Sequence, residues 1–253
     1  MQPQIIGQLK HLQGYFKMGI FRGPKIVRDG LVLNLDAKNS KSYGGSGNTW
    51  TDLSGNGYNA TKQGNATYNT NGWWEFRNVN GDNDFEYFNL SMDEGILKSG
   101  STAAAWSLET WWRDRGSAYG NENIIVGRLG HHAGILQKTA GTQVYGQIRT
   151  NAGGTGQIST STVSTTDDVW MHVVFAYSNR TSKLYVNGSL EETDTMSTSY
   201  TIYNHSNVMN IGGYGHNYYR TYADIAVVKA YNRELNSADV LQNYNALKGR
   251  FTI

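Results

Sequence analysis

The chain has 253 residues with no cysteine, a charged fraction of 17% and a formal net charge of +2. The absence of cysteine excludes disulfides, thiolate metal sites and a cysteine nucleophile, and no apolar run is long enough to cross a membrane as a helix. The length suits one large β-sandwich. The many Gly, Asn, Ser, Thr and Tyr residues favour strands and turns over helices.

Residues 1–29 differ from the rest in charge, because they hold five Lys or Arg residues against one Asp. Their apolar residues recur at helical spacing, although Gly7 and Gly14 weaken that helix and Pro24 ends it. We predict a basic arm that packs on its own domain or on a neighbouring subunit and docks to an acidic surface; a solvated linker is the alternative. The residues assigned to this assembly arm are Ile5, Leu9, Leu12, Phe16, Lys17, Arg22, Lys25 and Arg28.

From Leu31 onward the hydrophobic pattern has a period of two, which is typical of strands with one face in a core. Asn187-Gly188 stands between two such runs and predicts a two-residue hairpin turn with positive φ at both positions. Short strands separated by Gly, Asn and Ser indicate a sandwich or jelly roll. The predicted strand segments are 31–36, 104–112, 123–129, 142–150, 169–178, 182–192, 207–213 and 222–232.

One helix is expected over residues 237–248, with Asn236 or Ser237 as its N-cap and Gly249 after its end. The predicted fold class is therefore all-β: an antiparallel two-sheet jelly-roll sandwich over residues 30–253, preceded by the arm over 1–29. The apolar stripe of the helix would consist of Val240, Leu241, Tyr244 and Leu247.

Three segments together resemble the concanavalin A-like, or laminin G-like, jelly-roll superfamily over about Gly30 to Gly249. They are GLVLNLDAKNSKSY with TWTDLSGNGYNAT (within 30–61), WMHVVFAYSNRTSKLYVNGSL (170–190) and IGGYGHNYYRTYADIAVVKAYNRELNSADVLQNYNALKG (211–249). The opening DGLVLNLDAKN and the closing AYNRELNSADVLQNYNALKGRF resemble versions found in tailed-phage virion proteins. The resemblance implies core packing roles for Trp111, Trp170 and His172. Tyr222-Ala223-Asp224 departs from the family, which often has Gly before the last strand.

The segment GDNDFEYF (81–88) alternates Asp82, Asp84 and Glu86, so a strand would place the three carboxylates on one face. Glucanases of the superfamily use Glu-x-Asp-x-Glu along a strand, but here Asp82 replaces the first Glu and the strand comes early in the chain, so we expect no catalysis. Calcium stays an alternative, with Asp82 and Asp84 as its ligands. The interpretation we favour places Phe85 and Tyr87 inward, with Phe88 as a further candidate for the core, and all three acids in water.

No other catalytic or metal motif is present, and the adjacent His131 and His132 would point to opposite faces of a strand. We therefore expect no catalytic residue, no metal ligand and no cofactor apart from the calcium alternative. Aromatic loops are the better candidates for binding, since their rings can stack on sugars while neighbouring polar groups bind hydroxyls. The candidate ligand-binding residues are Trp73, Trp74, Tyr214, His216, Tyr218, Tyr219 and Arg220.

The sequence predicts a non-enzymatic phage virion protein, such as a capsid decoration, tail fibre or tail-associated subunit. It would be anchored to other virion proteins through residues 1–29 and would display a lectin-like jelly roll. The alternative is a carbohydrate-binding module, with or without calcium, that adsorbs to polysaccharide on the host cell surface. We expect synthesis in the host cytoplasm without a signal peptide, location in the virion, and no binding to nucleic acid or membrane. A homo-oligomer is expected for this class of protein, and a trimer is a guess.

Overall fold

The structure is a computed structural model that describes residues 24–78, 85–92, 104–116, 122–128, 133–138, 143–148, 157–198, 200, 208–214 and 221–251. Predictions for other positions lie outside the described residues. These positions include the arm residues Ile5, Leu9, Leu12, Phe16, Lys17 and Arg22.

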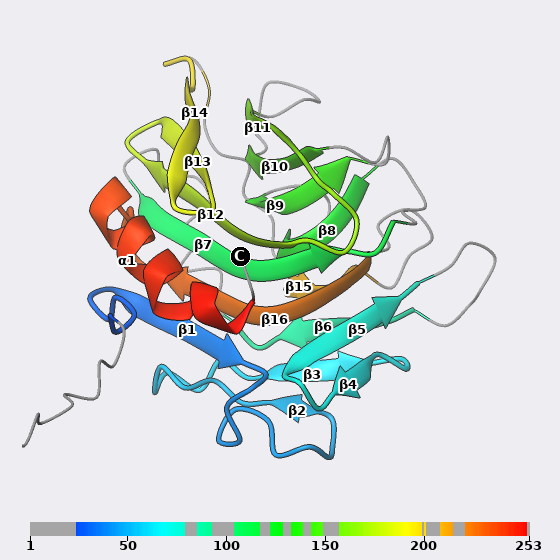
Figure 1. The fold of residues 1–253 in the computed structure, drawn as a ribbon. Helices are drawn as coiled ribbons and strands as arrows, with labels where there is room; N and C mark the ends of the chain where they lie inside the picture. Colours follow the sequence, from blue (N-terminus) through cyan, green and yellow to red (C-terminus); the bar gives the residue numbers. More distant parts are fainter. Residues whose placement is uncertain are drawn as a thin grey trace, which may run out of the picture.

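Two antiparallel sheets face each other and form a sandwich that fits a jelly roll (Figure 1). Sheet A has the strand order β14-β13-β12-β7-β16-β5-β4, with β1 also paired to β16. Its strands are β1 (Leu31–Asp36), β4 (Thr67–Asn69), β5 (Trp73–Arg77), β7 (Ala105–Asp114), β12 (Trp170–Ser178), β13 (Thr181–Val186), β14 (Ser189–Thr195) and β16 (Tyr222–Tyr231).

Sheet B has the strand order β11-β10-β9-β8-β15-β6-β3-β2. Its strands are β2 (Thr49–Trp50), β3 (Ala60–Gln63), β6 (Tyr87–Leu90), β8 (Glu122–Arg128), β9 (Ala133–Lys138), β10 (Gln143–Ile148), β11 (Gln157–Ser164) and β15 (Met209–Ile211). The predicted strand segments all contain a strand. Among the described residues, β2 to β5, β9 and β11 lie outside those segments.

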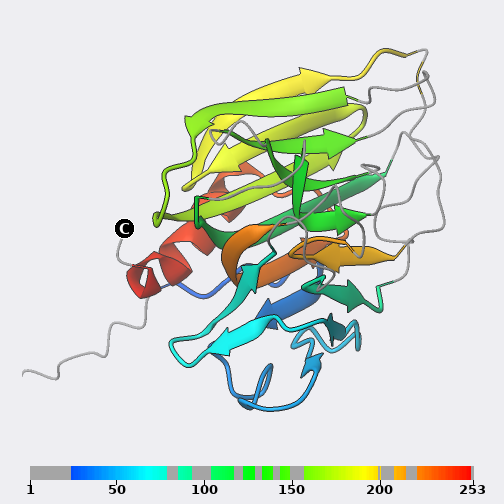
Figure 2. The same cartoon turned by 90° about the vertical axis from the view of Figure 1, so that its right-hand side faces the viewer.

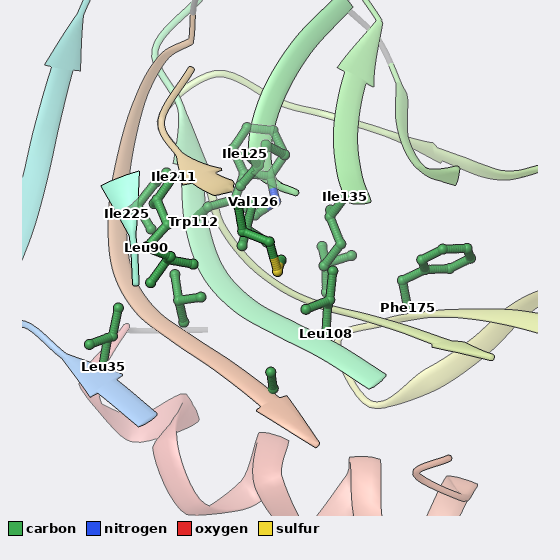
Figure 3. Packing of buried hydrophobic residues seen from close by; sticks show 14 of the residues in the cluster. Leu35, Leu90, Leu108, Trp112, Ile125, Val126, Ile135, Phe175, Ile211 and Ile225 are labelled. Atoms are coloured by element: carbon green, nitrogen blue, oxygen red, sulfur yellow. The ribbon is translucent and has the colours of Figure 1, made fainter. Parts of the chain in front are cut away.

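The main core lies between the two sheets, where side chains from both inner faces interdigitate (Figure 3). Leu108, Trp112 and Phe175 come from sheet A, while Val126 and Ile135 come from sheet B; all five are fully buried. Close packing leaves no room at Gly146, where an added Cβ would lie 2.1 Å from the Phe175 ring. The period-two pattern therefore identified the strands because one face of each sheet is sealed in this way.

Strand β12 is apolar on both faces because its outer face is covered as well. Met171, Val173 and Phe175 belong to the main core, whereas Val174 packs in a second cluster with Val240 of the helix. The helix α1 (Ser237–Leu247) lies against the outer face of sheet A, followed by the 3-10 turn η1 (Lys248–Arg250) (Figures 1 and 2). A strand buried on both sides loses the simple alternation of a half-exposed strand.

The predicted two-residue hairpin turn and the predicted N-cap of the helix are both confirmed. Asn187 and Gly188 have φ of 50° and 87°, and Val186 pairs with Ser189 across the two-residue turn. Asn236 is the N-cap and forms a capping box with Asp239.

The predicted apolar stripe of α1 is wrong at one position, because Leu241 is 48% exposed. Its side chain lies beside Gly188 of the hairpin turn instead of pointing at the sheet. The buried side chains of α1 are Val240 and the polar Asn243.

The chain before β1 packs on α1, although residues 24–29 were predicted as part of the arm. The Val27 amide donates to Asn243 Oδ1 at 2.7 Å, and Gln242 Nε2 donates to the Lys25 carbonyl at 2.7 Å. Val27 is buried, whereas Lys25 and Arg28 are exposed. The contacts of the domain thus begin before residue 30.

In the described part of the GDNDFEYF segment, the prediction is wrong for Glu86, whereas Phe88 lies in the core as one of the residues predicted to do so. Phe88 and Leu90 are buried in the core, and Phe85 and Tyr87 are half-buried. Glu86 does not stand on a water-facing column: its carboxylate accepts from the Arg77 amide, and its own amide donates to a side chain of the preceding loop, Asn78, at 2.8 Å. This pairing fixes the entry to β6. Asp82 and Asp84 lie outside the described residues.

Candidate functional site

The outer face of sheet A carries an unusual set of polar and aromatic side chains. The strand register aligns them in rows across β12, β7, β16 and their neighbours. One row contains Trp170, Arg113, Asp224, Glu75 and Thr67. The row of Val174 contains Glu109, Lys229 and Asn34.

Glu109, in β7, is the centre of a buried ion cluster beneath α1. Its Oε1 pairs with Lys229 Nζ and lies 3.1 Å from His172 Nε2, and its Oε2 accepts from Asn243 Nδ2 at 2.6 Å. Burial alone would raise the pKa of Glu109, but Lys229 and His172 lower it to about 2. Burial lowers the pKa of His172, so this imidazole is neutral at pH 7.

The same cluster ties the helix and the N-terminal segment to the sheet. Asn243 also donates to Tyr231 Oη at 2.9 Å, and Tyr231 Oη donates to the Val27 carbonyl at 3.3 Å. Glu109 and His172 have no exposed surface, so they cannot contact a ligand. The predicted core role of His172 is confirmed by this burial.

Two adjoining cavities of about 450 and 480 Å³ open on the same face, beside the row that contains Arg113. They share three lining residues, Trp73, Arg250 and Phe251, and we call the combined surface the aromatic trough. The first cavity is completed by Lys38, Asn71 and Gly72. The second is completed by Arg113, Asp168, Val169 and Trp170.

Aromatic rings and one guanidinium form the floor of the trough. Trp73 meets Trp170 edge-on at 5.5 Å, and the Arg113 guanidinium lies 5.1 Å from the Trp73 ring and 4.9 Å from the Trp170 ring. Phe251 stacks at 4.3 Å on Trp111 beneath it. Trp73 is half-buried and Trp170 is nearly covered, so Trp73 offers the larger accessible ring.

Arg113 is held in place by Asp224, whose side chain has no exposed surface. Arg113 Nε donates to Asp224 Oδ2 at 3.0 Å, and Arg77 donates to Asp224 Oδ1 at 2.7 Å. Arg115 lies 3.8 Å from the same carboxylate and also pairs with Asp168 at the edge of the trough. A buried carboxylate needs such partners, and in return it fixes the arginine side chains.

The rim of the trough is built by a glycine and a bidentate ion pair. Gly72 has φ of 105°, and an added Cβ would lie 2.6 Å from Lys38, so the lysine side chain packs directly over it. Arg250 binds both carboxylate oxygens of Asp36 at 2.8 and 3.0 Å. These contacts set the spacing between η1 and the end of β1.

The sequence-predicted binding residues do not lie together in the structure. Trp73 lines the trough, but Trp74 is fully buried in the main core and offers no ring face to a ligand, so it is removed from the candidates. Tyr214 packs with Ile124 and Tyr145 on sheet B, on the opposite side of the sandwich from Trp73. His216, Tyr218, Tyr219 and Arg220 lie outside the described residues.

Sequence reasoning missed Arg113, Arg250, Phe251 and Lys38, and assigned Trp170 to packing alone. The signal that was present is the alternation within β5, which places Trp73 and Trp74 on opposite faces. The strand register that brings Trp170 and Arg113 beside Trp73 cannot be derived from the local sequence.

Within the described ranges, no group of three or more His, Asp or Glu residues could hold a metal ion. The calcium candidates Asp82 and Asp84 and the pair His131-His132 lie outside those ranges. No helix in the described part of the chain has the length and apolarity needed to span a membrane.

Residues 91–241 match the laminin G-like family described as the concanavalin A-like lectin/glucanases superfamily. The chain belongs to this superfamily. No curated protein sequence matches it.

Solved structures with the same fold include binding domains and enzymes. The binding domain of botulinum neurotoxin DC, in complex with rat synaptotagmin II, is 15% identical with a TM-score of 0.64, and the match covers 87% of this chain and 52% of that chain. Botulinum neurotoxin type C, described as entering cells through two ganglioside molecules, is 16% identical with a TM-score of 0.62 and the same coverage.

Trypanosoma rangeli sialidase in complex with sialic acid is 18% identical with a TM-score of 0.61; the match covers 88% of this chain and 34% of that chain. The chain thus spans about half or a third of the structures it matches. At these identities the likeness shows the fold alone.

Proposed function

We propose that the chain is a non-enzymatic, lectin-like module that binds carbohydrate in the aromatic trough. The observation that carries this proposal is the accessible Trp73 ring at the junction of two sugar-sized cavities. Binding sites for small ligands are concave, largely apolar surfaces with a few fixed polar groups. The trough is concave and has fixed polar groups beside its aromatic rings, although its lining as a whole is more polar than apolar.

The chemistry of the trough suits a pyranose ring. The C–H groups of one sugar face can lie on Trp73, while Asn71, Lys38 and Asp168 at the rim can bind hydroxyl groups. Asp224 and Trp170 hold Arg113 in place, so the floor is rigid before a ligand arrives. Preorganised side chains lower the entropy lost on binding.

The superfamily assignment and the glycan-related structures with this fold agree with such a function. The structures with this fold also include a sialidase, so the carboxylates of this face were considered as catalytic groups. Glu109 is fully buried, and Asp224 is paired with Arg77 and Arg113. Neither of them lines the trough, and Asp168, which does, is paired with Arg115. This is why we propose binding without catalysis.

Replacing Trp73 with alanine is expected to weaken glycan binding at least tenfold, because truncating a central aromatic contact typically costs 2 kcal/mol or more. Glycans would first be identified on an array with and without a calcium chelator, and affinities then measured by calorimetry. Tyr200→Ala is the matched control, since Tyr200 is 40% exposed and lines neither cavity. Binding that is unchanged in Trp73→Ala, or absent for all glycans, would contradict the proposal.

A second proposal keeps the virion role predicted from the sequence: a capsid decoration, tail fibre or tail-associated subunit that is anchored by its arm. The observation in its favour is that Val27 and Lys25, at the described end of the predicted arm, bind α1 through their backbone groups. Lys25 and Arg28 are exposed there, as an acidic partner would require. Other virion proteins would be the partners, and a homo-oligomer, for example a trimer, would display the trough towards host glycans.

Deleting residues 1–23 is expected to abolish incorporation into the particle while the domain stays folded, because the contacts of Lys25 and Val27 remain. Incorporation would be measured by complementation and mass spectrometry of purified particles, and folding by circular dichroism. A truncated chain that is incorporated normally would refute the virion anchor.

A further inference from the structure

A third cavity of about 380 Å³ lies on the other side of the Arg250–Asp36 pair from the trough. Asp36 lines this cavity, while its partner Arg250 lines both cavities of the trough. The ion pair therefore forms the wall between them. The cavity is enclosed by the chain before β1, by β1 and the loop that follows it, and by the end of α1.

Three basic residues and one acidic residue line this cavity. Lys229 is 1% exposed and contributes to the lining, and the exposed Arg28 and Lys41 stand at the rim. Asn34 and Asn39 add polar walls beside them. The register places Asn34 directly opposite Lys229, so both belong to the same part of the sheet.

Two carboxylates near the cavity are paired with cations, and a third, Asp52, accepts hydrogen bonds from the Asn34 and Ser54 amides. Asp36 is bound by Arg250 through both oxygens, and Glu109 is paired with Lys229. Within the described part of the chain, the side chains of Arg28 and Lys41 have no hydrogen bond and no ion pair. Two positive charges, those of Arg28 and Lys41, thus remain unpaired at the rim of the pocket.

We propose that this cavity is an anion pocket, which binds a carboxylate or a sulfate group carried by a saccharide. Arg28 and Lys41 would contact the anion directly, while the charge of Lys229 is already balanced by Glu109. Charged donors form stronger hydrogen bonds to oxyanions than neutral donors do. The apolar side chains Ile26, Leu53 and Leu247 provide surface for the carbon skeleton of the same ligand.

The inference deepens the proposed function and rests on it, because it identifies the ligand as an acidic saccharide whose charged group occupies this pocket. A sugar ring in the trough and an anionic group in the pocket would lie on either side of Arg250. Neutral glycans would use the trough alone. The two parts can be tested separately, since they depend on different residues.

The test titrates the full chain, labelled with 15N, with glucuronate, glucose and inorganic sulfate at low ionic strength, and follows amide chemical shifts. Glucuronate is expected to shift the amides of Asn34, Asn39 and Lys41 in a saturable way, and glucose is expected to leave them unchanged. Lys41→Gln and Arg28→Gln should each weaken glucuronate binding about five- to tenfold, because each removes one charged contact. Raising the salt concentration should weaken binding further.

Lys62→Gln is the matched control, because it removes one positive charge from β3 of sheet B and leaves the pocket intact. Equal binding of glucose and glucuronate, or unchanged affinity in Lys41→Gln and Arg28→Gln, would overturn the anion pocket. Sulfate that binds as tightly as glucuronate would overturn the saccharide part, since the pocket would then bind an adventitious ion only. If Trp73→Ala leaves neutral glycan binding intact while glucuronate still shifts the pocket, the trough proposal fails and the anion pocket stands.

Discussion

Replacing Glu109 with glutamine is expected to lower the free energy of unfolding by about 3–5 kcal/mol, the usual cost of breaking a buried ion pair by removing one partner. The ammonium group of Lys229, whose side chain is 1% exposed, would lose the carboxylate that balances it. The replacement would also weaken the contact to Asn243, which holds α1 and the Val27 amide. Urea unfolding followed by circular dichroism measures the change, with linear extrapolation to water.

The exposed pair Lys183–Glu234 provides the control for this prediction. Its Nζ–Oε1 distance is 2.7 Å, but the two side chains are 32% and 28% exposed, so Glu234→Gln should cost at most about 1 kcal/mol. Combining Glu109→Gln with Lys229→Met should recover part of the loss, because the unpaired ammonium group is removed. Similar costs for Glu109→Gln and Glu234→Gln would show that the buried cluster has no special importance.

Replacing Trp111 with alanine is expected to destabilise the protein by about 3–5 kcal/mol, as large-to-small replacements of buried aromatic residues do. Trp111 is fully buried between the outer face of sheet A and the helix. Its ring stacks on Phe251 at 4.3 Å and on Tyr244 at 5.8 Å, and lies 5.1 Å from the His172 ring. The replacement would remove the ring on which Tyr244 of α1 and Phe251 of the trough pack, so both would be held less firmly.

Thermal and urea unfolding measure this loss, and glycan titration of the folded fraction measures its effect on the trough. Trp111→Phe keeps most of the stacking surface and should cost less than the alanine replacement. Leu241→Ala is the control in α1, since that side chain is 48% exposed and should change stability by no more than about 0.5 kcal/mol. A small effect of Trp111→Ala would mean that the helix is not held by this cluster.

Features encoded over a few residues were predictable from the sequence. The Asn187-Gly188 turn requires positive φ at both positions, and the Asn236 cap needs one side chain close to the first helical amides. The orientation of the GDNDFEYF segment was not predictable in this way. Its alternation was recognised, but the face that turns inward is set by Asn78, which binds the backbone on both sides of Glu86.

The candidate site was less predictable than the fold. Trp73 was predicted to bind a ligand from its place in an aromatic loop and lines a cavity in the structure, whereas its neighbour Trp74 is a core residue. Nothing local to Arg113 or Phe251 marks either residue as part of the same surface. Their meeting depends on the pairing of β5 with β16, of β16 with β7, and on the return of the chain through α1.

The sequence by itself determined the class of the protein: a cysteine-free β-sandwich with one C-terminal helix. Period-two burial, glycine turns and helix caps act over short distances along the chain. The tertiary structure decided which side chains a ligand can reach. It buried Glu109, Lys229 and His172 beneath α1, and it left open the aromatic trough and the third cavity, which we propose as an anion pocket. These outcomes depend on strand register and on charge pairing between residues far apart in sequence, and both are fixed only when the two sheets and the helix pack together.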